Sequence, residues 1–160
     1  MARVLIVGCG CRGTELAEAL LERGHAVRGT TRDASRLAAL EARGIHGVTA
    51  DPDRLATLVP HIDGVSVLCW LMASADGDAA ALHGDRLESL LDTLVDTHVR
   101  GVVYEAAGSV EPSLLERGAA LVRMAGETYR MPAELVDHDP TDHHGWVEAM
   151  AAAVDRVLAA

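Results

Sequence analysis

The sequence contains no lysine, asparagine, glutamine or phenylalanine, and all 14 of its basic residues are arginine. We interpret this skew as coding bias of the kind that a GC-rich bacterial genome produces. The absence of lysine means that no reaction step in this chain can use a lysine amine. No apolar run approaches the ~20 residues that a membrane-spanning helix needs. Residues 3–7 read directly as a strand, without a signal-peptide pattern, so we expect a cytoplasmic protein that is not bound to a membrane.

Cysteine is scarce as well. The three cysteines are Cys9, Cys11 and Cys69, and the first two lie in a glycine-rich turn. An odd number with this spacing argues against a disulfide framework. Cys9 and Cys11 form a C-x-C pair, which in principle can bind a metal, but no further cysteine pair stands at zinc-ligand spacing. The pattern therefore favours two small residues in a tight loop, and we predict no metal site.

Acidic residues outnumber basic ones by 24 to 14, which gives a net charge of −10. This balance argues against nucleic acid as the main partner, although it leaves room for a local phosphate site. Hydrophobic residues make up 49% and charged residues 24%, as in a globular protein rather than a disordered one. Because the sequence has no repeat and no long linker, we expect a single domain over residues 1–160.

Apolar runs of strand length alternate with helical patterns along the whole chain. The expected strands cover residues 3–7, 26–30, 47–50, 64–71, 101–107 and 131–136. The expected helices cover residues 12–22, 34–42, 85–97, 112–125 and 142–158, with a helical turn reaching residue 58 and a loop over 72–84. This alternation predicts an α/β protein with a three-layer Rossmann fold. Its doubly wound, six-stranded parallel sheet should have the order 3-2-1-4-5-6, with a ligand crevice between strands one and four.

Three glycines follow the first strand in the pattern G-x-G-x-x-G, as Gly8, Gly10 and Gly13. The pattern by itself is a weak signal, but here a strand precedes it and a helix follows it. Gly8 permits the turn, Gly10 lets a pyrophosphate approach the backbone, and Gly13 lets the helix pack closely on the strand. The free N–H groups and the dipole of the helix favour phosphate there. The sequence therefore predicts a dinucleotide site, with an empty tight turn as the alternative.

The end of the second strand selects the nucleotide. An NAD site places an acid there to bind the ribose 2′-hydroxyl group, whereas this chain has Thr30, Thr31 and Arg32. An arginine pairs with a 2′-phosphate, so we predict that NADP(H) is favoured over NAD(H). Arg12 is expected to reach the same side, and Arg36 is a weaker candidate. The missing acid also argues against adenosylmethionine, and Asp33 is expected to cap the next helix.

Two stretches, VLIVGCGCRGTELAEALLERGHAVRGTTRD and GVVYEAAGSV, resemble the atypical and extended short-chain dehydrogenase/reductases. This group includes the NAD-dependent epimerase/dehydratase and NAD(P)H-binding proteins. The resemblance weakens after residue 110. It implies a Rossmann fold and a nicotinamide cofactor, with Asp51 contacting adenine and with Trp70 and Leu71 lining the ribose and nicotinamide. By its position alone, Trp70 either stacks on a cofactor or closes the core.

The chain departs from the catalytic members of that family. They have serine or threonine at the end of strand five, where this chain has Ala106 and Ala107. They also have a Tyr-x-x-x-Lys motif, whereas Tyr129 is followed by RMPA. The C-terminal substrate domain of the extended members is missing too. The remaining candidates for a catalytic role are Glu105, Ser109 and Tyr129; Glu105 follows Tyr104 in an expected buried strand, where its pKa would be perturbed.

For the remaining polar segments we predict structural roles. The stretch VDHDPTDHH clusters Asp137, His138, Asp139, Asp142, His143 and His144. We interpret it as a polar loop in which Asp142 stands near a helix N-cap. His83 precedes a helix and is predicted to lie on the surface. The loop 72–84 borders the expected nicotinamide end and is predicted to be mobile when the site is empty.

Three hypotheses for function follow from these residues. The first is an NADP(H)-binding sensor or regulatory module without standard reductase catalysis, which acts as a homodimer or with a protein partner. The second is a small NAD(P)-dependent oxidoreductase or epimerase-like enzyme that uses non-standard residues. The third is a Rossmann-like protein that binds no nucleotide. The missing serine and lysine favour the first over the second, and the complete glycine pattern argues against the third.

Overall fold

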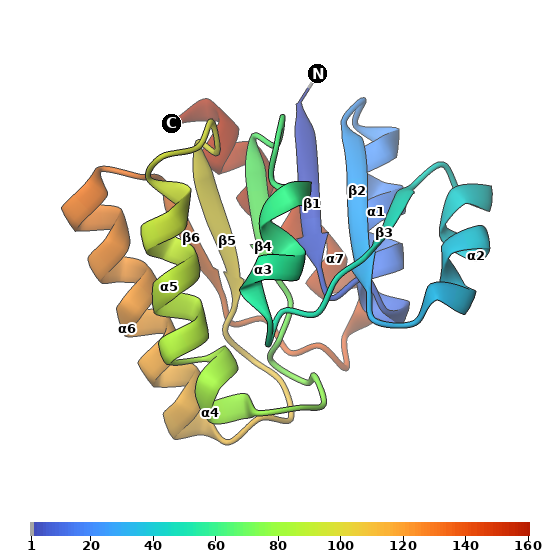
Figure 1. The fold of residues 1–160 in the computed structure, drawn as a ribbon. Coiled ribbons are helices and arrows are strands. Elements are labelled where there is room, and N and C mark those ends of the chain that lie inside the picture. The colour runs from blue at the N-terminus through green and yellow to red at the C-terminus, as the bar shows by residue number, and fades with distance from the viewer. Residues whose placement is uncertain (1) are drawn as a thin grey trace.

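The computed structural model describes residues 2–160. A single parallel sheet forms its centre, with the strand order β3-β2-β1-β4-β5-β6 (Figure 1). The strands are β1 (Arg3–Val7), β2 (Ala26–Thr31), β3 (His46–Thr49), β4 (Val67–Trp70), β5 (Gly101–Glu105) and β6 (Ala133–Val136). The doubly wound Rossmann fold that the sequence predicts is therefore confirmed, including the reversal of strand order between β1 and β4.

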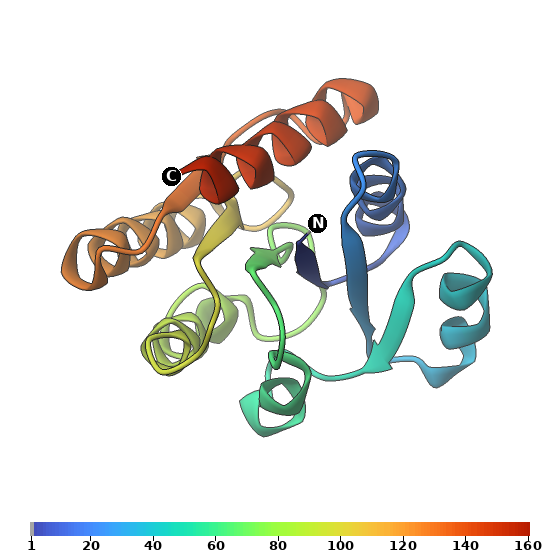
Figure 2. The ribbon, with the colours of Figure 1, turned by 90° about the horizontal axis from the view of Figure 1, so that it is seen from above.

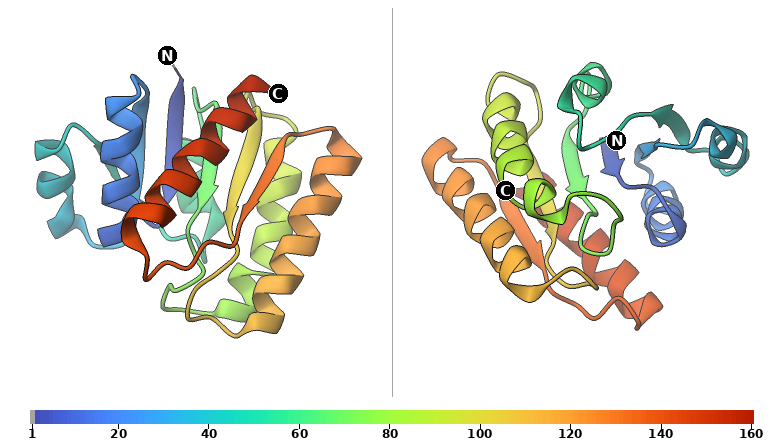
Figure 3. Two further views of the ribbon diagram at one scale, coloured as in Figure 1. Left: turned by 180° about the vertical axis from the view of Figure 1, so that it is seen from behind. Right: turned by 60° about the horizontal axis from the view of Figure 1, so that its bottom comes forward.

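Helices cover both faces of the sheet (Figures 2 and 3). They are α1 (Cys11–Glu22), α2 (Leu37–Ala42), α3 (Leu55–Leu58), α4 (Ala79–Leu82), α5 (Asp85–Leu94), α6 (Pro112–Tyr129) and α7 (His143–Ala159), with 3-10 turns at Ala34–Arg36 and Val59–His61. One apolar core lies between the sheet and α1, α2 and α7, and the other lies between the sheet and α3, α5 and α6. Among the described residues, no helix has the length and apolarity needed to cross a bilayer.

The local patterns explain most of these elements. The buried side of α5 consists of Leu87, Leu90, Leu91 and Leu94, at the spacing of one helix face. Two expected caps are confirmed: Asp33 accepts a hydrogen bond from the Ser35 N–H group at 2.9 Å, and Asp142 accepts one from Gly145 at 3.3 Å. Each cap satisfies a backbone donor that the first turn leaves without a partner.

Some boundaries differ from those expected. Strand β4 begins at Val67 instead of residue 64, because Gly64 has a φ of +75° in a turn that the Val65 N–H group closes onto Ile62 O. Helix α6 continues past residue 125 to Tyr129, where Arg130 in the left-handed region ends it. Turn residues thus override the apolar pattern at the ends of elements.

The segment 72–84 differs from the loop that the sequence predicts. It contains the short helix α4, which Asp78 caps by accepting a hydrogen bond from the Ala81 N–H group. His83, expected on the surface, is 0% exposed. Its Nδ1 lies 2.6 Å from the Tyr104 hydroxyl group and its Nε2 lies 2.9 Å from Met72 O. Burial lowers the pKa of His83, which favours the neutral ring.

Candidate functional site

In the turn between β1 and α1, neighbouring atoms pack closely against two of the three glycines. Gly8 has a φ of +94°, and a Cβ atom on it would lie 2.5 Å from Met72 Cε and 2.7 Å from Leu71 O. A Cβ atom on Gly13 would lie 2.8 Å from Gly8 O, inside van der Waals contact. Both positions therefore need glycine for the fold itself, one for the turn and one for the close packing of helix on strand.

Gly10 differs from the other two glycines. It is the N-cap of α1 with a φ of −83°, so its backbone does not require glycine. A Cβ atom on it would approach only Arg36 Nη1, at 4.0 Å. The space above Gly10 is thus open, and the first N–H groups of α1 have no partner within the helix. Such an arrangement fits a phosphate held against the backbone.

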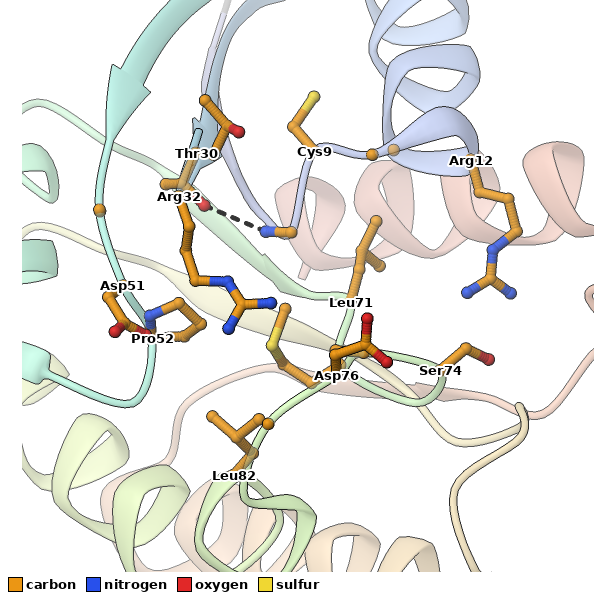
Figure 4. A pocket seen from close by; sticks show the side chains of 18 of the residues that line it. Cys9, Arg12, Thr30, Arg32, Asp51, Pro52, Leu71, Ser74, Asp76 and Leu82 are labelled. Atoms are coloured by element: carbon orange, nitrogen blue, oxygen red, sulfur yellow. Dashed lines mark hydrogen bonds between the residues drawn. The ribbon is translucent and has the colours of Figure 1, made fainter. Parts of the chain in front are cut away.

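A cavity of about 430 Å³ lies over this turn, at the carboxyl ends of the strands (Figure 4). It spans the point where the strand order reverses, which is where open α/β sheets bind ligands. Many of the residues predicted as a cofactor site line it together: Gly8, Gly10, Arg12, Gly13, Thr31, Arg32, Asp51 and Leu71. The topology thus brings these side chains to one place from β1, β2, β3 and β4.

Two arginines occupy the β2 end of the cavity. Arg32 is exposed and points into the cavity in Figure 4, close to the position of Gly77 in the segment after β4. Arg36 lies nearer to Gly10. Neither guanidinium group forms an ion pair within the described part of the chain. This end of the cavity therefore offers two guanidinium groups to a ligand, beside carboxylates of the same wall such as Asp51 and Asp76.

Arg12 occupies the opposite end, contrary to the expectation that it reaches the same side as Arg32. Its Nη1 lies 3.3 Å from Glu105 Oε2, and its guanidinium group lies 5.3 Å from the centre of the Trp146 ring. The reason is its position on the first turn of α1, which faces β5 and α7. Two further residues line the cavity, Trp146 and Arg36. The helical spacing of Trp146 indicated only a core position. Arg36 stands in the first turn of a helix, which made it a weaker candidate.

Glu105 ends β5 at the bottom of the same cavity and is 0% exposed. Its Oε1 accepts a hydrogen bond from the Ala73 N–H group at 3.0 Å. Burial raises the pKa of Glu105 above its usual range, and the positive charge of Arg12 opposes that shift. Glu105 is thus buried and not solvated at the end of its strand, and its catalytic role stays a prediction.

A second cavity, of about 640 Å³, adjoins the first and shares Arg12 and Ser74 with it. Ser109 lines this second cavity rather than the first. Residues of the polar loop after β6 complete its wall: Asp137, Asp139, Pro140, Thr141 and His143. In this loop His138 pairs with Asp142 at 2.8 Å, and no group of metal-ligating side chains is found among residues 2–160.

Two predicted site residues lie elsewhere. Trp70 is 1% exposed in the apolar core, where its indole N–H donates to Leu82 O at 3.1 Å, so it closes the core. Tyr129 is the last residue of α6, which ends at the edge of the sheet away from the cavities (Figure 1). Its hydroxyl group donates to Asp92 at 2.7 Å, and this carboxylate raises the pKa of Tyr129. Neither side chain lines either cavity.

The segment after β4 forms one wall of the cavity and leads to a prediction. Met72, Ala73, Leu82 and His83 are buried, whereas residues 76–78 are exposed. We expect saturating NADPH to slow amide hydrogen exchange in residues 74–78, because the bound molecule covers them, and to leave residues 82–84 unchanged. Hydrogen exchange measured by mass spectrometry, with and without NADPH, checks this. Equal exchange of residues 74–78 with and without NADPH would contradict the prediction that the bound dinucleotide covers this segment.

Comparisons with known proteins agree with this geometry. A family model described as NAD(P)H-binding matches residues 8–138. No curated protein matches the sequence. Solved structures with the same fold include vestitone reductase from alfalfa, at 18% identity and a TM-score of 0.66 over 86% of this chain and 56% of that one.

Two bacterial structures are similar to the same degree. Triphenylmethane reductase from Citrobacter sp., complexed with NADP(H), has 17% identity and a TM-score of 0.66 over 85% of this chain and 49% of that one. A short-chain dehydrogenase/reductase superfamily protein from Agrobacterium tumefaciens, with bound NAD, has 20% identity and a TM-score of 0.68 over 84% and 48%. The chain thus spans about half the length of these proteins.

The family match covers most of the chain, and the cavity offers what a dinucleotide requires: an open backbone at Gly10, a helix N-terminus and unpaired arginines. The bound cofactor would supply a nicotinamide ring that accepts or donates hydride. The chain belongs to the NAD(P)H-binding family and binds an NAD(P)H dinucleotide on the Rossmann fold that short-chain dehydrogenase/reductases and epimerases share.

Proposed function

We propose that this chain is an NADP(H)-binding module that prefers NADP(H) to NAD(H) and acts as a sensor or regulatory unit. The observation that carries the preference is Arg32, which ends β2 with its charge free of any partner among the described residues and its side chain in the cavity. A guanidinium group binds a phosphate through two parallel, charge-assisted hydrogen bonds. No acid stands in its place to hold a 2′-hydroxyl group.

The second part of the proposal is the absence of ordinary carbonyl reduction. Hydride transfer to a carbonyl needs a proton donor next to the developing alkoxide. Ala106 and Ala107 offer no hydroxyl group after β5, and the chain has no lysine to lower the pKa of a tyrosine. Tyr129 is held by Asp92 at the far edge of the sheet. These residues support a binding role over the standard reductase chemistry.

One observation favours an alternative function. Glu105 lies at the bottom of the main cavity beside Arg12, which also lines the second cavity, where Ser109 lies. A buried carboxyl group with a raised pKa is able to act as a general acid. The second candidate is therefore a small NAD(P)-dependent oxidoreductase or epimerase-like enzyme that uses Glu105 as its acid.

A turnover assay separates the two functions. With NADPH and a panel of aldehydes, ketones and sugar nucleotides, we expect no substrate-dependent oxidation of NADPH above the rate without protein. The physical reason is the absence of the serine or threonine after β5 and of the Tyr-x-x-x-Lys pair, which supply the proton in standard reductases. The assay follows absorbance of the reduced nicotinamide. Steady oxidation that disappears in Glu105→Gln, and survives in the exposed variant Glu116→Gln, would establish the enzyme instead; loss in Tyr129→Phe would assign the acid to Tyr129.

A further inference from the structure

The pair formed by Arg12 and Glu105 lies on the boundary between the two cavities. Arg12 comes from the first turn of α1 and lines both cavities, while Glu105 comes from the end of β5 and lines the first. The Arg12 side chain is 26% exposed and the Glu105 side chain is 0% exposed. The cation therefore lies between the buried carboxylate and solvent.

The buried carboxylate is incompletely satisfied. Its Oε1 accepts the hydrogen bond from Ala73, but its Oε2 has no hydrogen bond within the described residues and only the ion pair with Arg12 at 3.3 Å. Trp146 Nε1, from α7, is likewise buried and forms no hydrogen bond of good geometry among the described residues, although its N–H group lies close enough to lower the pKa of Glu105. A buried carboxylate with so few hydrogen bonds depends on its charged neighbour, Arg12, to remain ionised.

The surroundings of Glu105 are otherwise neutral. Trp146 faces it from α7 and the Ala73 amide from the segment after β4. Val136 lies opposite it on β6. The adjacent Tyr104, on its own strand, has a pKa raised by burial and by the Glu105 charge, so it remains protonated. Arg12 is the charged group that acts on the protonation of Glu105.

A dinucleotide brings negative charge to this pair. Its phosphates are expected at the N-terminus of α1, where Arg12 stands on the first turn. A phosphate competes with Glu105 for the guanidinium group, and its own negative charge further disfavours an ionised carboxyl group nearby. Both effects act in the same direction, toward a protonated Glu105.

Resting on the dinucleotide binding proposed above, we propose that Glu105 takes up a proton from the solvent when NADPH binds, because the phosphates draw Arg12 away from it. The proton leaves a buffer acid and binds to a carboxylate oxygen of Glu105; no other bond changes. The pair thus couples dinucleotide occupancy to proton binding at the boundary of the second cavity.

The sign of the pH dependence follows from linkage. If the pKa of Glu105 is higher in the complex than in the free protein, NADPH binds more tightly as pH falls through the interval between the two values. Within that interval the affinity gains up to about tenfold per pH unit, and outside it Glu105 contributes no slope.

Isothermal titration calorimetry tests the proposal. NADPH binding to the full chain is measured in two buffers of different ionisation enthalpy, which counts the protons taken up. The same titrations use Glu105→Gln, which keeps an oxygen acceptor for the Ala73 N–H group, and the control Glu116→Gln on the exposed face of α6. The fragment adenosine 2′-monophosphate, which lacks the nicotinamide half and both phosphates of the pyrophosphate bridge, reports protonation at the 2′-phosphate end.

We expect NADPH to bind the unmodified chain and Glu116→Gln with equal proton uptake, larger than that of Glu105→Gln by up to about one proton. With adenosine 2′-monophosphate, which brings no phosphate to the N-terminus of α1, the three proteins should agree. Equal uptake by all three with NADPH would overturn the proposal while leaving dinucleotide binding intact; no binding of NADPH would instead overturn the proposed function.

If Glu105→Gln does not fold, a second variant tests the same proposal. Arg12→Met removes the cation but keeps an apolar stem over Trp146. Glu105 should then already be protonated in the free protein, because a buried carboxylate without a neighbouring cation takes up a proton. The Glu105 contribution to NADPH-linked uptake should disappear in this variant, whatever its affinity. Uptake equal to that of the unmodified chain would contradict the assignment to the pair.

Discussion

Gly10→Val is expected to abolish dinucleotide binding while the protein stays folded. The backbone of Gly10 lies in an extended region that valine adopts, and a Cβ atom there meets nothing closer than Arg36 Nη1 at 4.0 Å. The isopropyl group would therefore enter the cavity, in the space that a pyrophosphate needs. Loss of the glycine N-cap costs about 1 kcal/mol of stability at most. Calorimetry with NADPH and NADH measures the binding, and circular dichroism measures the fold.

The neighbouring glycines provide a contrast for this result. Gly13→Ala places its Cβ atom 2.8 Å from Gly8 O, so it should lower the unfolding temperature as well as weaken binding. Gly10→Val should change the unfolding temperature much less. Normal NADPH affinity in a folded Gly10→Val protein would show that the ligand does not lie on this turn.

Arg32→Ala should weaken NADPH binding by about 1.5–3 kcal/mol, the usual contribution of a hydrogen bond to a charged group. This corresponds to roughly a tenfold to hundredfold higher dissociation constant. Binding of NADH should hardly change, because NADH lacks the 2′-phosphate. The unmodified chain should accordingly bind NADPH more tightly than NADH. Titrations of both proteins with both dinucleotides measure the four dissociation constants.

Two further arginines sharpen this test. Arg36 Nη1 would lie 4.0 Å from a Cβ atom on Gly10, so Arg36→Ala should weaken NADPH and NADH alike through the pyrophosphate. Arg123, exposed on α6 and outside both cavities, is the matched control and should leave both affinities unchanged in Arg123→Ala. Equal affinity of the unmodified chain for NADPH and NADH would refute the assignment of Arg32 to the 2′-phosphate.

The end of the cavity where we propose that the dinucleotide binds follows from local sequence. The turn glycines and Arg32 stand directly at the ends of β1 and β2, and parallel strands place their carboxyl ends at one edge. The alternation of strand-length apolar runs with helical patterns was sufficient to predict the strand order, because right-handed crossovers leave few arrangements of such units. These features depend on neighbours in the chain, and so the sequence by itself determined them.

The other end was decided only by the tertiary structure. Arg12 pairs with Glu105 and covers Trp146, and these three residues come from α1, β5 and α7. His83 is buried because Tyr104 and Met72 O satisfy its ring, although its own segment reads as an exposed loop. In each case a polar side chain finds its partner across the fold, and no periodic pattern encodes which one. Burial makes that partner necessary, since an unpaired polar group in the core costs more than the contact contributes.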